Sequence, residues 1–161
     1  MTSTLPAIDA PHGSPIAALA AREIGDHLAR LAQPCGLARI AIAHGDSRDG
    51  EGFSWTAQDG VVAIAADGPR GALYAAYDLL EALGFAWPAP GDPETIVPAE
   101  PQELLAARPY QTPALAGRSL ILGHHAFMAS AHAWIVWAAR NRLNTIFFHI
   151  DEHGLGLGAI P

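Results

Sequence analysis

The stretch "FSWTAQDGVVAIAADGPRGALYAAYDLLEALG", residues 53–84, decides the fold of the first part of the chain. Its first half alternates apolar and polar residues around Asp59-Gly60, which predicts two strands joined by a tight hairpin turn. After Pro69 the apolar residues recur three and four positions apart, which predicts a helix that Gly84 ends. A hairpin followed by an amphipathic helix indicates an α+β domain.

The residues before this stretch extend the same domain. Residues 1–13 are expected to form a loose lead-in, and Ser14-Pro15 predicts the start of a first helix, because serine caps helices and proline suits the first helical position. The alternating run 37–44 predicts a strand. We therefore expect residues 1–98 to form a small, mostly antiparallel sheet with two helices on one face.

The residues after this stretch predict a different architecture. Residues 99–116 are rich in proline and are expected to be a linker. The runs 117–122, 127–142 and 144–150 predict strand, helix and strand, which together form a parallel βαβ unit. One such unit cannot bury both faces of its strands. We therefore expect 117–150 to form a homo-oligomer through exposed strand edges, or to pack back onto the first domain.

Composition limits the classes of function. The chain has 161 residues and a formal net charge of −7, which argues against nucleic acid or an anionic membrane as a partner. Cys35 is the only cysteine, so no internal disulfide forms. The N-terminus lacks the pattern of a signal peptide, and no apolar run reaches the ~20 residues of a membrane span. These features predict a soluble, cytoplasmic protein.

The last residues contain two short motifs. His149, Glu152 and His153 fit the pattern H-x-x-E-H, in which helical spacing brings two histidines to one zinc ion. Here the motif continues an apolar run typical of a strand, where residues four apart lie ~13 Å from each other. Gly154 and Gly156 fit a loose dinucleotide pattern, but no helix follows to receive a phosphate. We therefore expect no metal and no cofactor.

Residues 51–98 resemble the accessory domain that precedes the catalytic barrel in family 20 hexosaminidases and family 67 α-glucuronidases. The residues that match the pattern of those families are Arg70, Gly71, Tyr74, Ala75, Leu79, Leu80, Gly84, Trp87, Val97 and Pro98. The resemblance continues over 114–153, which is similar to the first strand, first helix and second strand of the barrel. It implies that 117–161 is the start of a truncated (β/α)8 barrel.

The resemblance also implies site residues and a partner. Arg118 of "GRSLIL" matches an arginine that binds sugar hydroxyls in hexosaminidases, while "RLNTIFFHIDEH" resembles a pattern that contributes His149, Asp151 and Glu152 to the same site. These four residues are the predicted substrate-binding residues, and carbohydrate is the predicted partner. Ser119, Gly123 and Phe147 depart from the family pattern.

Three hypotheses of function follow. The favoured one is the N-terminal part of a glycoside hydrolase that is not itself catalytically competent, because the acid–base carboxylates of these families lie on later barrel strands. We therefore assign no catalytic residue to this chain. The alternative is a stand-alone carbohydrate-binding or protein-assembly module. The third is a zinc-dependent hydrolase that uses His149 and His153.

Overall fold

The computed structural model describes residues 5–122 and 129–148. The chain divides into two compact units, and each is described by itself. Unit 1 comprises Met1–Ala86 with Ile96–Ala114, and unit 2 comprises Trp87–Thr95 with Leu115–Pro161.

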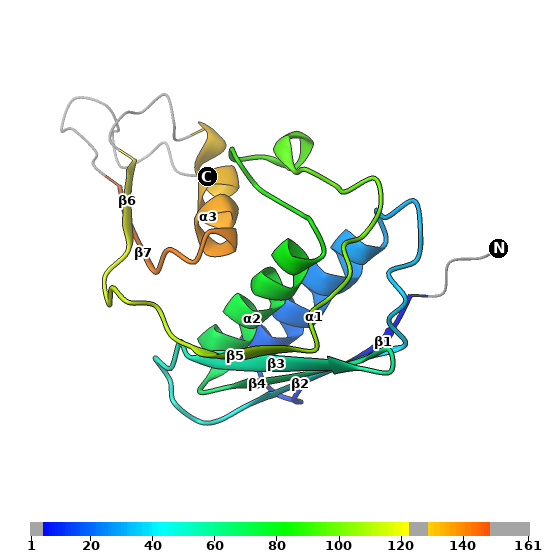
Figure 1. Ribbon diagram of the computed structural model, residues 1–161. Helices are drawn as coiled ribbons and strands as arrows, with labels where there is room; N and C mark the ends of the chain where they lie inside the picture. Colours follow the sequence, from blue (N-terminus) through cyan, green and yellow to red (C-terminus); the bar gives the residue numbers. More distant parts are fainter. Residues whose placement is uncertain (1–4, 123–128, 149–161) are drawn as a thin grey trace. The chain divides into compact units, whose positions relative to one another are not determined.

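Unit 1 contains a five-stranded sheet and two helices that lie on the same face of it (Figure 1). The elements in chain order are β1 (Ala7–Asp9), α1 (Pro15–Leu28), β2 (Arg39–His44), β3 (Phe53–Gln58), β4 (Val61–Ala66), α2 (Pro69–Ala82) and β5 (Ala107–Gln111). The predicted start of α1 is confirmed, because the Ser14 hydroxyl accepts a hydrogen bond from the Ala17 amide at 3.3 Å.

The sheet is mixed, which corrects the prediction of a mostly antiparallel sheet. Its order is β1-β2-β4-β3-β5, in which β2 pairs in parallel with both β1 and β4, while β3 pairs antiparallel with β4 and β5. Strands β1 and β2 are parallel because α1 carries the chain back to the same end of the sheet before β2 begins, and β2 and β4 are parallel because β3 runs the opposite way between them in the chain. The prediction failed because β1 has only three residues and lies in the expected lead-in, and because β2 pairs with β4 instead of with its neighbour in sequence, β3.

The predicted hairpin between β3 and β4 is confirmed. Gln58 pairs with Val61, so the turn contains only Asp59 and Gly60. Both turn residues have positive φ, 51° and 76°, as a two-residue hairpin turn of this type requires.

Strand β5 lies inside the segment that the sequence indicated as a linker. It is an edge strand, which pairs on one side only. Pro109 has no backbone N–H to donate, and an edge strand tolerates this better than an inner strand does. Its register with β3 shifts, because Trp55 pairs with Arg108 while Phe53 pairs with Gln111. The two β3 residues are two apart and their partners are three apart, so β5 contains a bulge with one extra residue.

The core of unit 1 lies between the sheet and the helices. Helix α2 is buried along most of its length, from Gly71 to Leu80, and Trp55, Tyr77 and Phe85 are each at most 2% exposed. The opposite face of the sheet presents exposed or half-buried residues, many of them small, together with the larger Arg39 and Val61. Burial on one face only explains why the strands alternate between buried and exposed positions.

Unit 2 is a strand–helix–strand unit, as predicted. Strand β6 (Ser119–Leu122) pairs in parallel with β7 (Thr145–Phe148), and α3 (Ala131–Arg140) connects them in sequence. The short 3-10 helix η1 (Asp92–Glu94) belongs to the same unit.

Aromatic contacts join the segment Trp87–Thr95 of unit 2 to α3. The Trp137 indole donates to the Trp87 carbonyl at 2.8 Å, and the Arg140 guanidinium lies over the Trp87 ring, 5.8 Å from its centroid. Trp134 and Trp137 meet edge to face at 5.7 Å. These three tryptophans therefore make packing contacts within unit 2.

Candidate functional site

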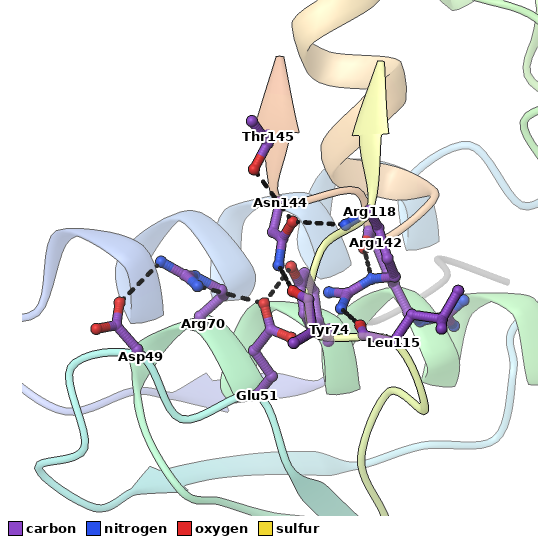
Figure 2. Close-up of polar contacts among 10 residues, drawn as sticks. Asp49, Glu51, Arg70, Tyr74, Leu115, Arg118, Arg142, Asn144 and Thr145 are labelled. Carbon is purple, nitrogen blue, oxygen red and sulfur yellow. Dashed lines mark hydrogen bonds and ion pairs between the residues drawn. The ribbon is translucent and has the colours of Figure 1, made fainter. Parts of the chain in front are cut away.

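Arg118 is the one predicted substrate-binding residue that lies among the described residues. It stands immediately before β6, at the amino end of the strand. Its Nε donates to the Arg142 carbonyl at 2.7 Å, and its Nη1 donates to the Leu115 carbonyl at 2.6 Å (Figure 2). Nε has a single hydrogen, so a sugar hydroxyl would have to displace its backbone contact, whereas Nη1 and Nη2 together carry three N–H groups beyond these two bonds. The predicted role in sugar binding stays a prediction.

Asn144 joins the same amino end from the neighbouring strand, because it directly precedes β7. Its side-chain oxygen accepts from the Arg118 amide at 3.0 Å, and its side-chain nitrogen donates to the Ala116 carbonyl at 2.6 Å. The amides of Asn144 and Thr145 both donate to the Arg118 carbonyl, at 3.0 and 3.2 Å. The asparagine thus binds one chain segment through both ends of its amide (Figure 2).

The other predicted site residues, His149, Asp151 and Glu152, lie outside the described residues, and so does His153 of the zinc hypothesis. Within 5–122 and 129–148, no group of three or more histidine, cysteine, aspartate or glutamate side chains is arranged to hold a metal ion.

A buried carboxylate in unit 1 was not predicted from the sequence. Asp78 of α2 is 6% exposed, and its Oδ2 accepts from the Trp55 indole at 2.8 Å and from Arg108 Nε at 2.9 Å. Its Oδ1 accepts from Gln111 at 3.2 Å. The Arg108 guanidinium also lies over the Trp55 ring, 5.9 Å from the centroid. This Asp78 network connects α2 to β3 and β5.

The bulge in β5 makes this network possible. Residues three apart in a regular strand point to opposite faces of a sheet. Because the bulge adds one residue between their pairing positions, Arg108 and Gln111 both reach Asp78 on the helical face. The carboxylate therefore fixes the edge strand to the core through charge-assisted hydrogen bonds.

A second polar cluster surrounds the start of α2. Arg70 contacts Asp49 at 3.2 Å and Glu51 at 3.3 Å, and the Tyr74 hydroxyl donates to Glu51 at 3.2 Å (Figure 2). The Gly71 amide donates to the Gly50 carbonyl at 3.0 Å, so the preceding loop satisfies a donor of the first helical turn. The cluster therefore holds the loop 45–52 against the helix.

Gly71 allows this close approach of loop and helix. A Cβ at that position would lie 2.5 Å from the Gly52 carbonyl oxygen, which is shorter than a van der Waals contact permits. The glycine of the family pattern thus has a packing role in this chain.

Unit 1 also has a surface depression of about 560 Å³ next to the β3–β4 turn. Its polar side chains come from Gln58, Asp59, Gln102 and Glu103, all of which are exposed. Binding pockets for small molecules usually combine enclosure with converging polar groups. The exposed position of these side chains is typical of a solvated surface.

The fold is similar to that of two solved glycoside hydrolase structures. One is a Streptomyces plicatus N-acetyl-β-hexosaminidase in complex with Thio-NAglucal, with a TM-score of 0.63 and 19% identity over 94% of this chain. The other is a family GH115 4-O-methyl-α-glucuronidase with specificity for decorated arabinogalactans, with a TM-score of 0.66 and 15% identity over 96% of this chain. The chain spans 31% and 26% of their respective lengths.

Sequence comparison alone assigns no family. No protein-family model matches the chain, and no curated protein matches it either. At identities of 15–19%, the structural similarity establishes a glycoside hydrolase-like fold and nothing finer. The resemblance to family 20 hexosaminidases therefore holds at the level of the fold, whereas the glucuronidase belongs to family 115 rather than family 67.

In the described part of the chain, no helix is long and apolar enough to cross a membrane.

Proposed function

We propose that this chain is the N-terminal part of a carbohydrate-active glycoside hydrolase. In this proposal, unit 1 is the accessory α+β domain and unit 2 begins a (β/α)8 barrel. The chain by itself binds carbohydrate weakly at most and hydrolyses no glycoside.

The observation that carries the proposal is the extent of the structural similarity. It covers 94% and 96% of the chain, so it includes residues of both units, and both similar proteins are named as enzymes that act on glycosides. Parallel strands alternating with helices are the repeating element of such barrels. The parallel pairing of β6 and β7 across α3 agrees with one such repeat.

Exposed apolar side chains on unit 2 support the same proposal. Ile121 and Phe147 are partners in the register of β6 and β7, and they are 66% and 56% exposed. Both faces of a parallel sheet are normally covered. In a complete barrel, inward-pointing side chains from several strands fill the interior.

The proposed lack of catalysis by this chain alone follows from the groups that glycoside hydrolysis requires. Glycoside hydrolysis requires a general acid and either a second carboxylate or a participating substrate group. Loss of one proton-transfer group alone costs a factor of ~10²–10⁴. In the proposal those groups belong to later barrel strands.

The test compares two polypeptides. The reading frame is sequenced past codon 161, and this chain and the complete product are assayed with chromogenic N-acetylhexosaminides and glucuronides. We expect further strand–helix repeats with an Asp-Glu pair, and turnover by the longer product only. Turnover by the 161-residue chain, well above background, would refute the proposal that the catalytic groups lie outside this chain.

A protein-assembly module is the second candidate, and the exposed Ile121 and Phe147 favour it as well, because such patches also form protein interfaces. A stop codon directly after codon 161 would favour this candidate. Association measured for the purified chain would then become its main test.

A further inference from the structure

We infer that Arg118 and Asn144 form a structural clamp that fixes the register of β6 and β7 at their amino ends. This inference concerns the residue whose counterpart is expected to hold sugar. It deepens the proposed function, because it states what the predicted sugar-binding residue does within the unit that is proposed to begin the barrel.

The geometry of the guanidinium is the first argument. Nε and Nη1 of Arg118 point to two different carbonyl oxygens, those of Arg142 and Leu115, at 2.7 and 2.6 Å. One acceptor precedes β6 and the other precedes β7. The planar fork of arginine suits two acceptors held in fixed directions, which the single ammonium group of lysine does not reproduce.

The reciprocal contacts of the two residues are the second argument. Asn144 accepts from the Arg118 amide, and the Arg118 carbonyl accepts from the Asn144 amide. The Asn144 side chain also donates to Ala116. Each residue thus ties the segment before one strand to the segment before the other. This arrangement determines which residues pair, beginning with Ser119 and Thr145.

The position of the clamp gives its meaning for function. In (β/α)8 barrels, active sites lie at the carboxyl ends of the strands, and the amino ends serve stability. Arg118 and Asn144 precede their strands and therefore lie at the amino ends. If unit 2 begins a barrel, as proposed above, the clamp lies at the end that serves stability.

The test uses the purified chain with the variants Arg118→Lys and Asn144→Leu, the double variant, and Arg30→Met as the control. Arg30 is an exposed arginine of unit 1. Thermal unfolding is followed by tryptophan fluorescence, to which Trp87, Trp134 and Trp137 of unit 2 contribute together with Trp55 of unit 1. We expect each single clamp variant to lower the Tm by about 5–15 °C, the order expected for lost charge-assisted hydrogen bonds in a small domain.

The clamp also predicts coupling between the two residues. The double variant should lose less than the sum of the single variants, because both remove parts of one network. The control should keep the Tm of the wild type. In the wild-type chain, amide hydrogen exchange at Asn144 and Thr145 should be slow, which tests the clamp even if a variant fails to fold.

Binding of N-acetylglucosamine and glucuronic acid, measured by NMR titration, separates the two roles of Arg118. An unchanged Tm in Arg118→Lys, or rapid exchange at Asn144 in the wild type, would overturn the clamp. Loss of sugar binding at an unchanged Tm would assign Arg118 to the sugar. None of these outcomes depends on the reading frame, so the clamp and the proposed function can fail separately.

Discussion

The described residues of the two units differ in how many large apolar side chains they bury. In unit 1, Trp55 and Phe85 are each 2% exposed, whereas in unit 2, Ile121 and Phe147 are 66% and 56% exposed. Among the described residues, unit 1 has five strands and two helices, and unit 2 has two strands, helix α3 and the short 3-10 helix η1. A sheet buries an apolar face only if enough elements cover it. Among the described residues, unit 1 thus contains a buried core of its own, whereas Ile121 and Phe147 of unit 2 are exposed.

The largest effect is expected in the core of unit 1. Leu80 is fully buried in α2, so Leu80→Ala should lower the free energy of unfolding by ~2–5 kcal/mol through lost burial and the cavity left behind. Leu115 of unit 2 is 68% exposed, and Leu115→Ala should change it by less than ~0.5 kcal/mol. Urea unfolding measures both. Equal losses in the two variants would remove the contrast between the units.

A smaller effect is expected at the Asp78 network. Asp78→Ala leaves the buried Trp55 indole N–H without this acceptor, which costs ~1–3 kcal/mol in free energy of unfolding. Asp78→Asn keeps a side-chain oxygen and should lose less. Urea unfolding is again the measurement. A greater loss in the asparagine variant than in the alanine variant would contradict this account of the network.

Association of the chain should depend on unit 2. We expect the wild type to form dimers at high protein concentration, and Phe147→Ser to weaken dimerisation while changing the free energy of unfolding by less than ~0.5 kcal/mol. Sedimentation velocity measures the association. Leu105→Ser is the matched control, because Leu105 is 69% exposed but belongs to unit 1. A wild-type chain that stays monomeric at all concentrations would refute the prediction.

The smallest effect concerns a surface hydrogen bond of unit 1. The Tyr110 hydroxyl donates to Asp67 at 2.8 Å, and this bond raises the pKa of Tyr110 above its ordinary value of 10.0. A pKa raised by folding stabilises the folded state below the unfolded pKa, and the contribution disappears as pH rises through the folded pKa. Absorbance titration should therefore show a midpoint above 10.0 that falls in Asp67→Asn. An identical midpoint in both proteins would exclude the effect.

Local patterns in the sequence predicted the local structure of both units. The β3–β4 hairpin followed from Asp59-Gly60, and α1 followed from the capping Ser14, because turn and cap chemistry acts over a few residues. The pairing of β1 with β2 could not be predicted in this way. A strand of three residues has almost no periodicity, and its pairing depends on contacts made across the sheet.

The polar contacts were harder to predict for the same reason. An aspartate within the apolar stripe of α2 was the available signal for Asp78, since buried carboxylates need partners. Its partners Trp55, Arg108 and Gln111 lie 23, 30 and 33 residues away, and no short motif connects them. Arg118 was found by resemblance, but its backbone acceptors depend on the geometry of two strand ends.

Because of the bulge in β5, the hydrogen bonds of Asp78 depend on the number of residues in that strand. Deletion of one residue between Arg108 and Gln111 would restore regular alternation along the strand and turn one of the two side chains away from Asp78. Related sequences should therefore tolerate substitutions at Pro109 and Tyr110 more readily than insertions or deletions there. The number of residues in this segment is then inherited more strictly than their identity.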